Sequence, residues 1–336
     1  MQAHILTAYG KTGALALAEV ARPVAAPGEI LVQVHAAGLN PVDNAIVRGE
    51  FKPLLKFELP AVMGSDLAGV VVEVGAGVTR FKVGDAVFAS VFDTGRGALA
   101  EFAAVPEHAA AHKPANLDFV QAASIPMVGL TAWQSFHEHA LVKPGQQVFI
   151  PAGSGGIGSF AIQLAKQMGA RVATTTSTAN VALVRSLGAD EVIDYKQQDF
   201  TQVLSDYDVV LGTVKGDGLA QALGIVRPGS KVVSLIGPPT AEFARQRGMN
   251  VVFRCVMGLL SRKIRGLAGQ RGAAYSFMFV RPDGAQLAAI GQLLETGAIR
   301  PVIDKVYPFA QAREALAYLD QGRARGKVVV RMAPAP

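Results

Sequence analysis

Cysteine is almost absent from this chain, because Cys255 is the single one among 336 residues. One thiol forms no internal disulfide and builds no thiolate zinc cluster. Long hydrophobic runs are also missing, since the most apolar stretch, 251–260, is short and contains Arg254. The sequence therefore predicts no helix that spans a bilayer. The first ten residues lack a basic stretch followed by an apolar core, so we expect no secretory signal and a cytoplasmic protein.

Charged residues are few, at 17% of the chain against 50% hydrophobic residues. The 32 basic and 26 acidic residues leave a net charge of +6, which favours anionic ligands such as phosphorylated cofactors. No block of Lys and Arg alternates with aromatic residues, so nucleic acid is not an expected partner. The 36 glycines and 18 prolines are typical of an α/β enzyme with many tight turns. The length predicts two domains.

The hydrophobic pattern changes near residue 119. Before this point, alternating apolar residues and Gly-rich turns predict β-strands at 29–36, 70–75 and 85–89. After it, short buried strands alternate with helices, which indicates a parallel, doubly wound sheet. The expected strands of this second part are 147–150, 171–174, 191–194, 207–211, 231–235 and 275–280, and two of the helices are 160–168 and 182–187. A last strand at 327–330 is expected to return to the first domain.

A glycine-rich loop follows the expected strand 147–150. Gly153, Gly155 and Gly158 match G-x-G-x-x-G between a strand and a helix, which is the context this motif requires. The first glycine permits the tight turn, the second lets the backbone approach a pyrophosphate, and the third lets helix and strand pack closely. The motif predicts dinucleotide binding, and the alternative is a turn without a ligand. The residues expected to contact the cofactor here are Gly153, Ser154, Gly155, Gly156, Ile157 and Gly158.

No acidic residue occurs between Gly153 and Asp190. An acid about 20 residues past the glycine loop usually binds the ribose 2′-hydroxyl of NAD, so its absence favours NADPH. Hydroxyl and amide groups donate hydrogen bonds to a 2′-phosphate. The expected donors are Thr175, Thr176, Ser177, Asn180 and Tyr195. The alternative is a polar turn in which Ser177 or Thr178 only caps the next helix.

Six segments, in this order, carry a resemblance to a known family: AGLNPVD at 37–43, GSDLAGVV at 64–71, GLTA at 129–132, the glycine loop, LGADEVIDY at 187–195 and GKVV at 326–329. The chain resembles the medium-chain dehydrogenase/reductase superfamily over nearly its whole length, and most of all its zinc-free quinone oxidoreductase and alkenal/enone reductase branch. The resemblance implies a GroES-like, β-rich catalytic domain from residues 1–122 and 282–336, a Rossmann NADP-binding domain at 123–281, a cleft between them, and a homodimer. It also implies cofactor contacts from Asn40, Thr131, Ile236, Gly237, Phe277, Phe279 and Lys327.

The zinc alcohol dehydrogenases of this superfamily carry a Cys where this chain has Asn40, and a His–Glu pair where it has Ser65 and Asp66. Asn and Ser do not replace thiolate and imidazole at a zinc site, so no metal is expected. Without a Lewis acid, alcohol–ketone interconversion loses its main driving group, whereas hydride addition to a conjugated electrophile stays feasible. The expected function is an NADPH-dependent reductase of a small quinone or of the C=C bond of an α,β-unsaturated carbonyl. The alternatives are an enoyl-thioester reductase and a non-catalytic NADPH-binding protein.

Asn40 is the expected catalytic residue, because its amide can donate to a developing enolate oxygen as in an oxyanion hole. The alternative is that Asn40 only holds the backbone before Pro41. Asp43 and Asp66 either orient Asn40 or bond to backbone. Ala45 stands where many quinone reductases have Tyr, so the proton donor is unassigned and solvent is one alternative.

A basic segment at 240–275 departs from the plainer quinone reductases. It contains seven basic residues and one acid, Glu242, so its net charge is +6. Its apolar residues follow helical spacing, with Arg254, Arg262 and Arg265 on the other side. We expect a helical insert whose apolar face packs on its own protein over the cleft while the charged face stays solvated. The alternative is contact with an anionic membrane surface.

Overall fold

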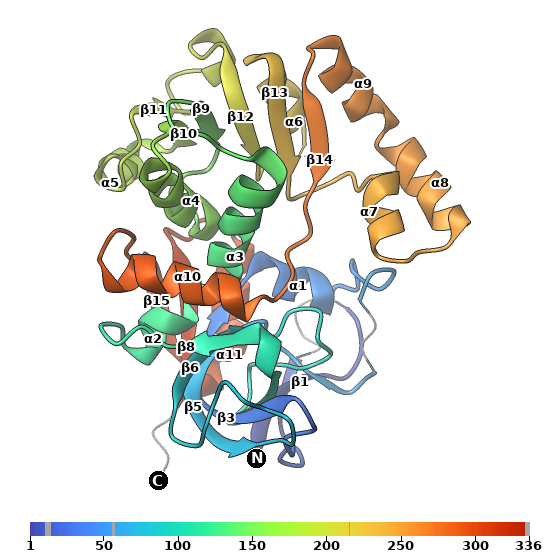
Figure 1. The fold of residues 1–336 in the computed structure, drawn as a ribbon, viewed down its shortest axis with the longest axis vertical. Helices are drawn as coiled ribbons and strands as arrows, with labels where there is room; N and C mark the ends of the chain where they lie inside the picture. The colour runs from blue at the N-terminus through green and yellow to red at the C-terminus, as the bar shows by residue number, and fades with distance from the viewer. Residues whose placement is uncertain (11–14, 56–57, 215, 333–336) are drawn as a thin grey trace. The chain divides into compact units, whose positions relative to one another are not determined.

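The computed structural model describes residues 1–10, 15–55, 58–214 and 216–332. The chain divides into two compact units (Figure 1), unit 1 from Met1–Leu130 and Arg281–Pro336, and unit 2 from Thr131–Val280. The domains predicted from the sequence have their boundaries at 122/123 and 281/282. Both units combine helices with sheets, so the α/β class is confirmed.

Unit 1 is built on two β-sheets, of three strands in the order β2-β1-β4 and of seven strands in the order β15-β16-β3-β5-β6-β8, with β7 paired to β3. The strands are β1 (Gln2–Leu6), β2 (Leu15–Glu19), β3 (Glu29–Leu39), β4 (Ala61–Val62), β5 (Asp66–Val74), β6 (Ala86–Ser90), β7 (Phe102–Pro106), β8 (Ala110–His112), β15 (Ile303–Pro308) and β16 (Lys327–Arg331). The alternating apolar pattern at 29–36 does form a strand, and β3 extends it to Leu39. The expected strands 70–75 and 85–89 form the second half of β5 and most of β6.

The helices that accompany these sheets are α1 (Pro41–Val47), α2 (Phe119–Ala123), α10 (Gly284–Glu295) and α11 (Ala312–Asp320), and α3 (Pro126–Gln134) crosses the boundary between the two units at Leu130. Short 3-10 turns lie at Glu107–Ala109 and Phe309–Gln311. The last strand returns to the first domain as expected, because β16 pairs antiparallel with β3 and places Val328 opposite Leu39. Close packing of α2 on β3 requires glycine at position 38, where a Cβ would lie 2.1 Å from the carbonyl oxygen of Ala123.

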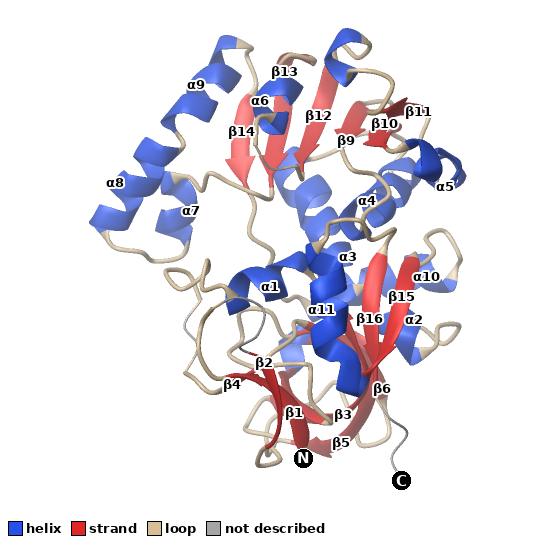
Figure 2. Ribbon diagram, turned by 180° about the vertical axis from the view of Figure 1, so that it is seen from behind, coloured by secondary structure: helices blue, strands red, loops and turns tan. Residues whose placement is uncertain are grey.

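Unit 2 contains one parallel sheet of six strands in the order β11-β10-β9-β12-β13-β14. The strands are β9 (Gln147–Ile150), β10 (Arg171–Thr176), β11 (Glu191–Asp194), β12 (Tyr207–Gly212), β13 (Val226–Ser234) and β14 (Ala274–Phe277). The helices are α4 (Gly156–Gln167), α5 (Val181–Ser186), α6 (Gly218–Ala222), α7 (Ala241–Gln246), α8 (Val251–Leu260) and α9 (Arg262–Gln270), with a π-helical turn at Ser135–Ala140 and 3-10 turns at Thr178–Asn180 and Phe200–Gln202. Helices α4 and α6 lie on opposite faces of the sheet (Figure 2), so the doubly wound prediction is confirmed.

The strand order fixes where a ligand of unit 2 binds. The chain runs outward from β9 through β10 to β11, and then crosses back to β12 on the other side of β9. In such sheets, ligands bind outside the carboxyl ends of the strands at the point where the order reverses. That point lies between β9 and β12, and the glycine loop follows directly after β9. Thr213, which follows β12, donates from its hydroxyl to the carbonyl of Pro151 at 2.9 Å and joins the two strand ends.

The basic insert is helical, as predicted, but its apolar face is not packed as expected. In α9 the expectation holds, because Ile264 and Ala268 are buried in the core cluster of the sheet. In α8 the expectation is wrong, because the apolar side chains of Val252 and Leu259 are 69% and 70% exposed. The inner face of α8 carries the buried Met257 and also Gly258, where a Cβ would make an ordinary 3.5 Å contact with Ala241 of α7.

Within the described part of the chain, the helices are all too short or too polar to cross a bilayer.

Candidate active site

The glycine loop shows which glycines the fold itself needs. A Cβ on Gly153 would lie 2.1 Å from Oγ1 of Thr174, and one on Gly158 would lie 2.5 Å from the carbonyl oxygen of Ala152. A Cβ on Gly155 would meet only that same oxygen, at an ordinary 3.4 Å. Internal packing therefore explains the first and third glycines, while the second keeps space open above the N-terminus of α4. Backbone N–H groups at a helix N-terminus favour an anion, and a side chain at position 155 would enter this space.

The predicted hydroxyl donors form one cluster beside this loop. The hydroxyl of Thr176 lies 3.0 Å from Oγ of Ser154, and Nδ2 of Asn180 lies 3.1 Å from the same oxygen and 3.2 Å from Oγ of Ser177. Oδ1 of Asn180 is buried without a hydrogen-bond partner. Serine hydroxyls both donate and accept, so rotating this amide by 180° keeps both contacts and puts N–H groups where the unpartnered oxygen lies. The cluster thus suits an anionic acceptor.

Thr175 and Tyr195, which are also predicted donors, lie apart from this cluster. The hydroxyl of Thr175 accepts a hydrogen bond from the backbone N–H of Ala152 at 3.1 Å, so it supports the glycine loop. Tyr195 follows β11 and its side chain is 61% exposed.

Asp194, an acid that the sequence motifs did not single out, lies next to the hydroxyl cluster. Asp194 ends β11 in register with Thr176, the last residue of β10. Its carboxylate accepts from the hydroxyl of Thr178 at 2.6 Å and from Nε2 of Gln197 at 2.9 Å, and the Thr178 hydrogen bond is the main reason why its pKa is lowered. Because three donors, including the backbone N–H of Lys196 at 3.0 Å, already hold this charge, it is committed to structure. The sequence placed both residues at the ends of parallel strands, and the register between the strands, which the structure adds, makes them neighbours.

Further predicted cofactor contacts lie where β13 and β14 end, at the same carboxyl edge of the unit 2 sheet. Ser234, the last residue of β13, is in register with Phe277, and its hydroxyl donates to the carbonyl of Gly237 at 2.9 Å. Phe277 and Phe279 contact the buried ring of Phe243 in α7, with ring centroids 4.9 and 5.7 Å apart. The remaining predicted contacts of unit 2 are Ile236, at 36% exposure, and Thr131, which is buried in α3. Phe243 was not predicted, because only the fold shows that it supports both rings.

Unit 1 holds a buried polar cluster around Asn40. Nδ2 of Asn40 donates to Oδ2 of Asp66 at 2.9 Å, and Oδ1 of Asn40 accepts from Nζ of Lys327 at 2.6 Å. The same ammonium lies 3.4 Å from Oδ2 of Asp66. Lysine only donates and an ionised carboxylate only accepts, so the orientation of the Asn40 amide is fixed. The three side chains are between 0 and 4% exposed.

Two further groups complete this cluster. The carboxylate of Asp43 accepts from the backbone N–H of Asn40 at 2.8 Å and from the hydroxyl of Ser65 at 2.5 Å. Asp66 also accepts from the backbone N–H of Met127 at 3.1 Å. Each acid therefore combines both roles considered from the sequence, since each bonds to backbone and also positions Asn40. The side chain of Asn40 bonds to Asp66 and Lys327 instead of to the backbone near Pro41.

Burial dominates the protonation of the cluster. It raises the pKa of Asp43 to about 6, although the hydrogen bonds from Ser65 and Asn40 oppose this change. It also raises the pKa of Asp66, where the Lys327 ammonium is the main opposing influence. Burial lowers the pKa of Lys327, and both acids oppose the change. With Asp66 and Lys327 ionised, the cluster changes from a net charge of −1 to neutral as Asp43 binds a proton near pH 6.

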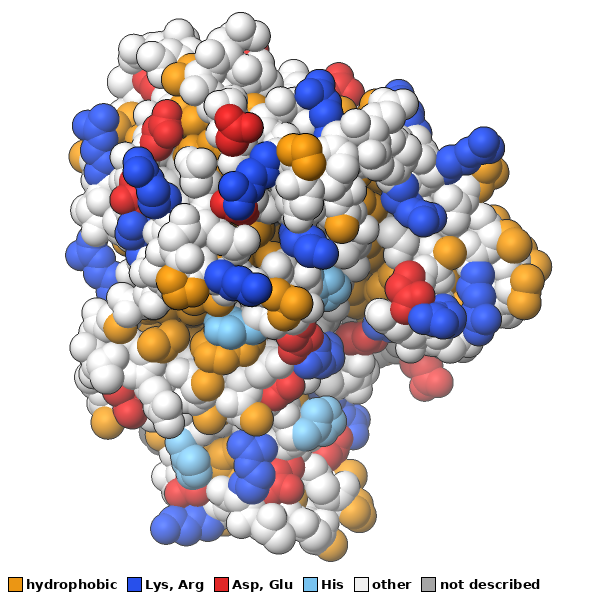
Figure 3. Space-filling model, turned by 45° about the horizontal axis from the view of Figure 1, so that its top comes forward, with side chains coloured by type: hydrophobic (Ala, Val, Ile, Leu, Met, Phe, Trp, Pro, Cys, Tyr) orange, Lys and Arg blue, Asp and Glu red, His pale blue; other side chains and the backbone are white. Residues whose placement is uncertain are grey.

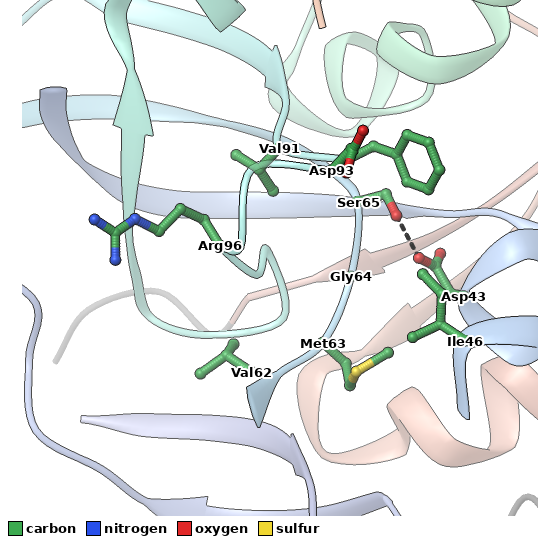
Figure 4. A pocket seen from close by; sticks show the side chains of 10 residues that line it. Asp43, Ile46, Val62, Met63, Gly64, Ser65, Val91, Asp93 and Arg96 are labelled. Atoms are coloured by element: carbon green, nitrogen blue, oxygen red, sulfur yellow. Dashed lines mark hydrogen bonds between the residues drawn. The ribbon is translucent and has the colours of Figure 1, made fainter. Parts of the chain in front are cut away.

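The donor set in this cluster does not fit a zinc ion. Asn40 and Ser65 offer a neutral amide and a hydroxyl, and the ammonium of Lys327 lies against the two oxygens that would otherwise be available, Oδ1 of Asn40 and Oδ2 of Asp66. Among the residues that the structure describes, no group of three His, Cys, Asp or Glu side chains is placed to hold a metal. A small cavity beside Asp43 and Ser65 (Figure 4) has room for about one water molecule and not for an organic substrate.

Comparisons with known proteins agree with this architecture. The alcohol dehydrogenase GroES-like domain model matches residues 26–115, and the zinc-binding dehydrogenase model matches residues 187–330. The chain is 34% identical to the mitochondrial NAD(P)H oxidoreductase RTN4IP1 of Danio rerio, over 98% of this chain and 91% of the relative. It is 35% identical to the chloroplastic NADPH-dependent alkenal/one oxidoreductase of Arabidopsis thaliana, over 98% and 79% of the two chains. The quinone oxidoreductase structure from Coxiella burnetii matches with a TM-score of 0.85 and 29% identity, over 99% of both chains.

The chain belongs to the medium-chain dehydrogenase/reductase superfamily. Its relatives place it in the quinone oxidoreductase and alkenal/enone reductase branch, as the sequence motifs predict. This medium-chain reductase is an oxidoreductase that uses a nicotinamide cofactor. Unit 1 is its GroES-like domain and unit 2 its Rossmann domain, so the predicted combination of the two is confirmed.

Proposed function

We propose that this medium-chain reductase uses NADPH to reduce a quinone or the C=C bond of an α,β-unsaturated carbonyl, without a metal. The observation that carries the proposal is the Asn40–Asp66–Lys327 cluster, in which an ammonium lies among the side chains at the positions of zinc ligands in related alcohol dehydrogenases. A buried ammonium cannot coordinate a carbonyl oxygen as a Lewis acid does, so a substrate that is already electrophilic is the better match. The names of the alkenal/one and quinone relatives support the same substrate class.

The cofactor half of the proposal rests on unit 2. The N-terminus of α4 and the open side of Gly155 would hold the pyrophosphate, and Ser154, Thr176, Ser177 and Asn180 would hold the 2′-phosphate of NADPH. These groups are neutral and offer donors to a doubly charged phosphate, while the neighbouring Asp194 carboxylate is already held by three donors of its own. The remainder of the cofactor would contact Phe277, Phe279, Ile236, Gly237 and Thr131. When bound, NADPH supplies the hydride.

Asn40 is the group that we propose to stabilise the substrate. Its amide nitrogen carries two N–H groups, of which one donates to Asp66, and the second would donate to the oxygen on which negative charge develops. The ammonium of Lys327 polarises this amide through Oδ1 and makes the remaining N–H a stronger donor. A quinone or enone spreads the incoming charge over its conjugated system, so one such donor suffices. Solvent would supply the proton.

The donor set of the Asn40 cluster supports the proposed metal independence. A homodimer is proposed because β14 is the edge strand of the unit 2 sheet, and among the described strands it pairs only with β13. Cytoplasmic location stays a prediction, and the names of two relatives place those proteins in a mitochondrion and a chloroplast.

The test is product analysis after incubation with NADPH and an enone that contains both a C=C and a C=O bond. We expect the saturated ketone, unchanged activity after treatment with a chelator, and little oxidation of simple alcohols with NADP⁺. An allylic alcohol as the product, or activity that chelation removes and zinc restores, would contradict the proposal. Comparing a free enal with its thioester separates this function from an enoyl-thioester reductase, and failure to oxidise NADPH with any acceptor would indicate a binding protein.

Asn40→Ala, compared with wild type in the same assay, should lower the turnover of the enone by about a hundredfold, the typical effect of removing one oxyanion-hole donor. The affinity for NADPH should change much less. Equal losses in turnover and in cofactor affinity would assign Asn40 to cofactor binding alone.

A further inference from the structure

Helix α8 presents a hydrophobic face to solvent. Of the 15 large hydrophobic side chains that are exposed among the described residues, six lie on this helix of ten residues. Their exposed fractions are 68% for Val251, 69% for Val252, 41% for Phe253, 48% for Val256, 70% for Leu259 and 60% for Leu260. A monomeric protein rarely exposes so contiguous an apolar patch unless a partner covers it. We call these six residues the α8 face.

Cations surround one end of the α8 face. Arg262, Lys263 and Arg265 in the first turns of α9 are exposed, and none of them lies within ion-pair distance of a carboxylate in the described part of the chain. The single acid between 240 and 275, Glu242, is 2.8 Å from Arg245 and is therefore already paired. Figure 3 shows hydrophobic side chains next to Lys and Arg side chains over the region of α7, α8 and α9, at the right of the view.

A shallow hollow joins the apolar and the basic parts. Leu259 lines it on the side of α8, and Arg262, Lys263, Gly266 and Gln270 line it along α9. Gly266 has no atom within 4 Å of the position of a Cβ, so the floor of the hollow is open. Two cations and an amide around an open space match the oxygens of a phosphate group. An apolar face that continues into a phosphate site matches a phospholipid.

The charge of the segment also selects between two kinds of partner. In a symmetric contact between two copies, the same patch meets itself. The cations beside the hollow would then face each other, and like charges at close range oppose such a contact. An anionic surface has the complementary charge.

We propose that α8 and the first turns of α9 bind the surface of a membrane that contains anionic phospholipids. The α8 face enters the boundary between headgroups and acyl chains, and Arg262 and Lys263 hold lipid phosphates at the hollow. Helices of this kind lie in the plane of the interface, with the apolar side buried and basic residues at the headgroups. The Rossmann sheet stays outside the lipid, because Ile264 and Ala268 fix α9 to its core.

The single cysteine of the chain gives a direct measurement, because Cys255 is exposed and lies on α8. An environment-sensitive fluorophore on Cys255 should shift to shorter wavelength when vesicles of phosphatidylcholine with about 30% phosphatidylglycerol are added, and spin-labelled acyl chains should quench it. Vesicles of phosphatidylcholine alone should have little effect. Flotation of the unlabelled protein with the same vesicles shows that the label is not the cause.

Two variants test the two parts of the surface. Arg262→Ala with Lys263→Ala should weaken partitioning by roughly 20-fold or more, since each cation near an anionic surface changes it by about fivefold. Leu259→Ser should weaken it as well, because less apolar surface enters the lipid. The matched controls are Arg185→Ala, at an exposed arginine of α5, and Val24→Ser, at a valine that is 72% exposed. Both controls should bind as wild type does.

Equal binding to neutral and anionic vesicles, no binding to either, or equal losses in the controls would overturn the proposal. A fluorescence shift that depends on protein concentration without vesicles, together with a dimer that Leu259→Ser converts to a monomer, would show that a second copy covers the α8 face instead.

Discussion

Replacing Lys327 by Met tests the buried cluster most directly. The change removes the ammonium and keeps a side chain of similar length, so the carboxylate of Asp66 loses its buried cation. With the two charges 3.4 Å apart, Coulomb's law at an effective dielectric constant of about 20 gives roughly 5 kcal/mol. Breaking a buried pair by removing one partner typically costs about 3–5 kcal/mol. We therefore expect Lys327→Met to lower the free energy of unfolding of unit 1 by about 3–5 kcal/mol at pH 8.

The loss should depend on pH in a defined direction. Burial raises the pKa of Asp66 above its unfolded value, and the pKa rises further once the ammonium is gone. A raised carboxyl pKa means that the folded state keeps its proton while the unfolded state releases it, so stability is highest at low pH and falls as the pH rises. The slope is at most about 1.4 kcal/mol per pH unit for one group. Lys327→Met should therefore be less destabilised at pH 5 than at pH 8.

The assay is urea unfolding followed by far-ultraviolet circular dichroism. The single tryptophan, Trp133, lies in unit 2, so its fluorescence follows the unfolding of that unit separately. Lys327→Met with Asp66→Asn should recover most of the lost stability, with a coupling energy of about 2 kcal/mol or more. Lys82→Met, at an exposed lysine of unit 1, is the matched control and should change stability by less than about 0.5 kcal/mol. If Lys327→Met costs less than about 1 kcal/mol at both pH values, the ammonium is not part of a buried pair, and the reasoning fails.

Three further predictions concern the cofactor loop and the second acid. The folded state holds the Asp43 proton with a pKa of about 6, so Asp43 should make wild type less stable as the pH rises from about 4 to about 6, and Asp43→Asn should remove this contribution. Urea unfolding across this range measures the effect, and an unchanged profile in the variant would be inconsistent with a buried Asp43. Gly155→Ala should weaken NADPH binding on the order of tenfold, because a charged hydrogen bond worth about 1.5 kcal/mol is lost, and should leave stability nearly unchanged. Gly153→Ala should instead destabilise unit 2, because its Cβ would lie 2.1 Å from Thr174. Calorimetric binding and thermal unfolding separate the two variants, and the reverse pattern would contradict the assignment. Thr176→Asp should weaken NADPH binding and leave NADH less affected, because it places a carboxylate by the 2′-phosphate; equal dissociation constants of both cofactors in wild type would already refute the preference.

Local patterns in the sequence predicted much of unit 2. The strands at 147–150 and 191–194 match β9 and β11, because short buried strands between turn signals depend on neighbours in the sequence. The glycine loop also lies between β9 and α4 as predicted, and Gly153 and Gly158 each answer a local steric demand. What the pattern did not contain is the register between strands, which brings Asp194 next to Thr176.

Contacts across long sequence separations were harder to predict. Asn40 and Lys327 are 287 residues apart, and only the pairing of β16 with β3 brings their side chains together. The amphipathic pattern of α8 was visible, but a pattern states that one face is apolar and not which face meets the protein. The packing decides this: Met257 is buried and Gly258 faces Ala241 of α7, which leaves Leu259 on the outside.

The discontinuity of unit 1 sets the order in which this protein can fold on the ribosome. Strand β3 leaves the exit tunnel early, but its neighbour β16 begins at Lys327, so about 200 residues must be translated after Leu130 before the sheet can close. At bacterial or eukaryotic elongation rates of about 5–20 residues per second, this interval is on the order of 10–40 s. The whole of unit 2 is synthesised within it. During that time Asp43 and Asp66 lack their cation, and the 36–39 end of β3 lacks its strand partner β16, so a chaperone that protects this end would act before β16 is translated.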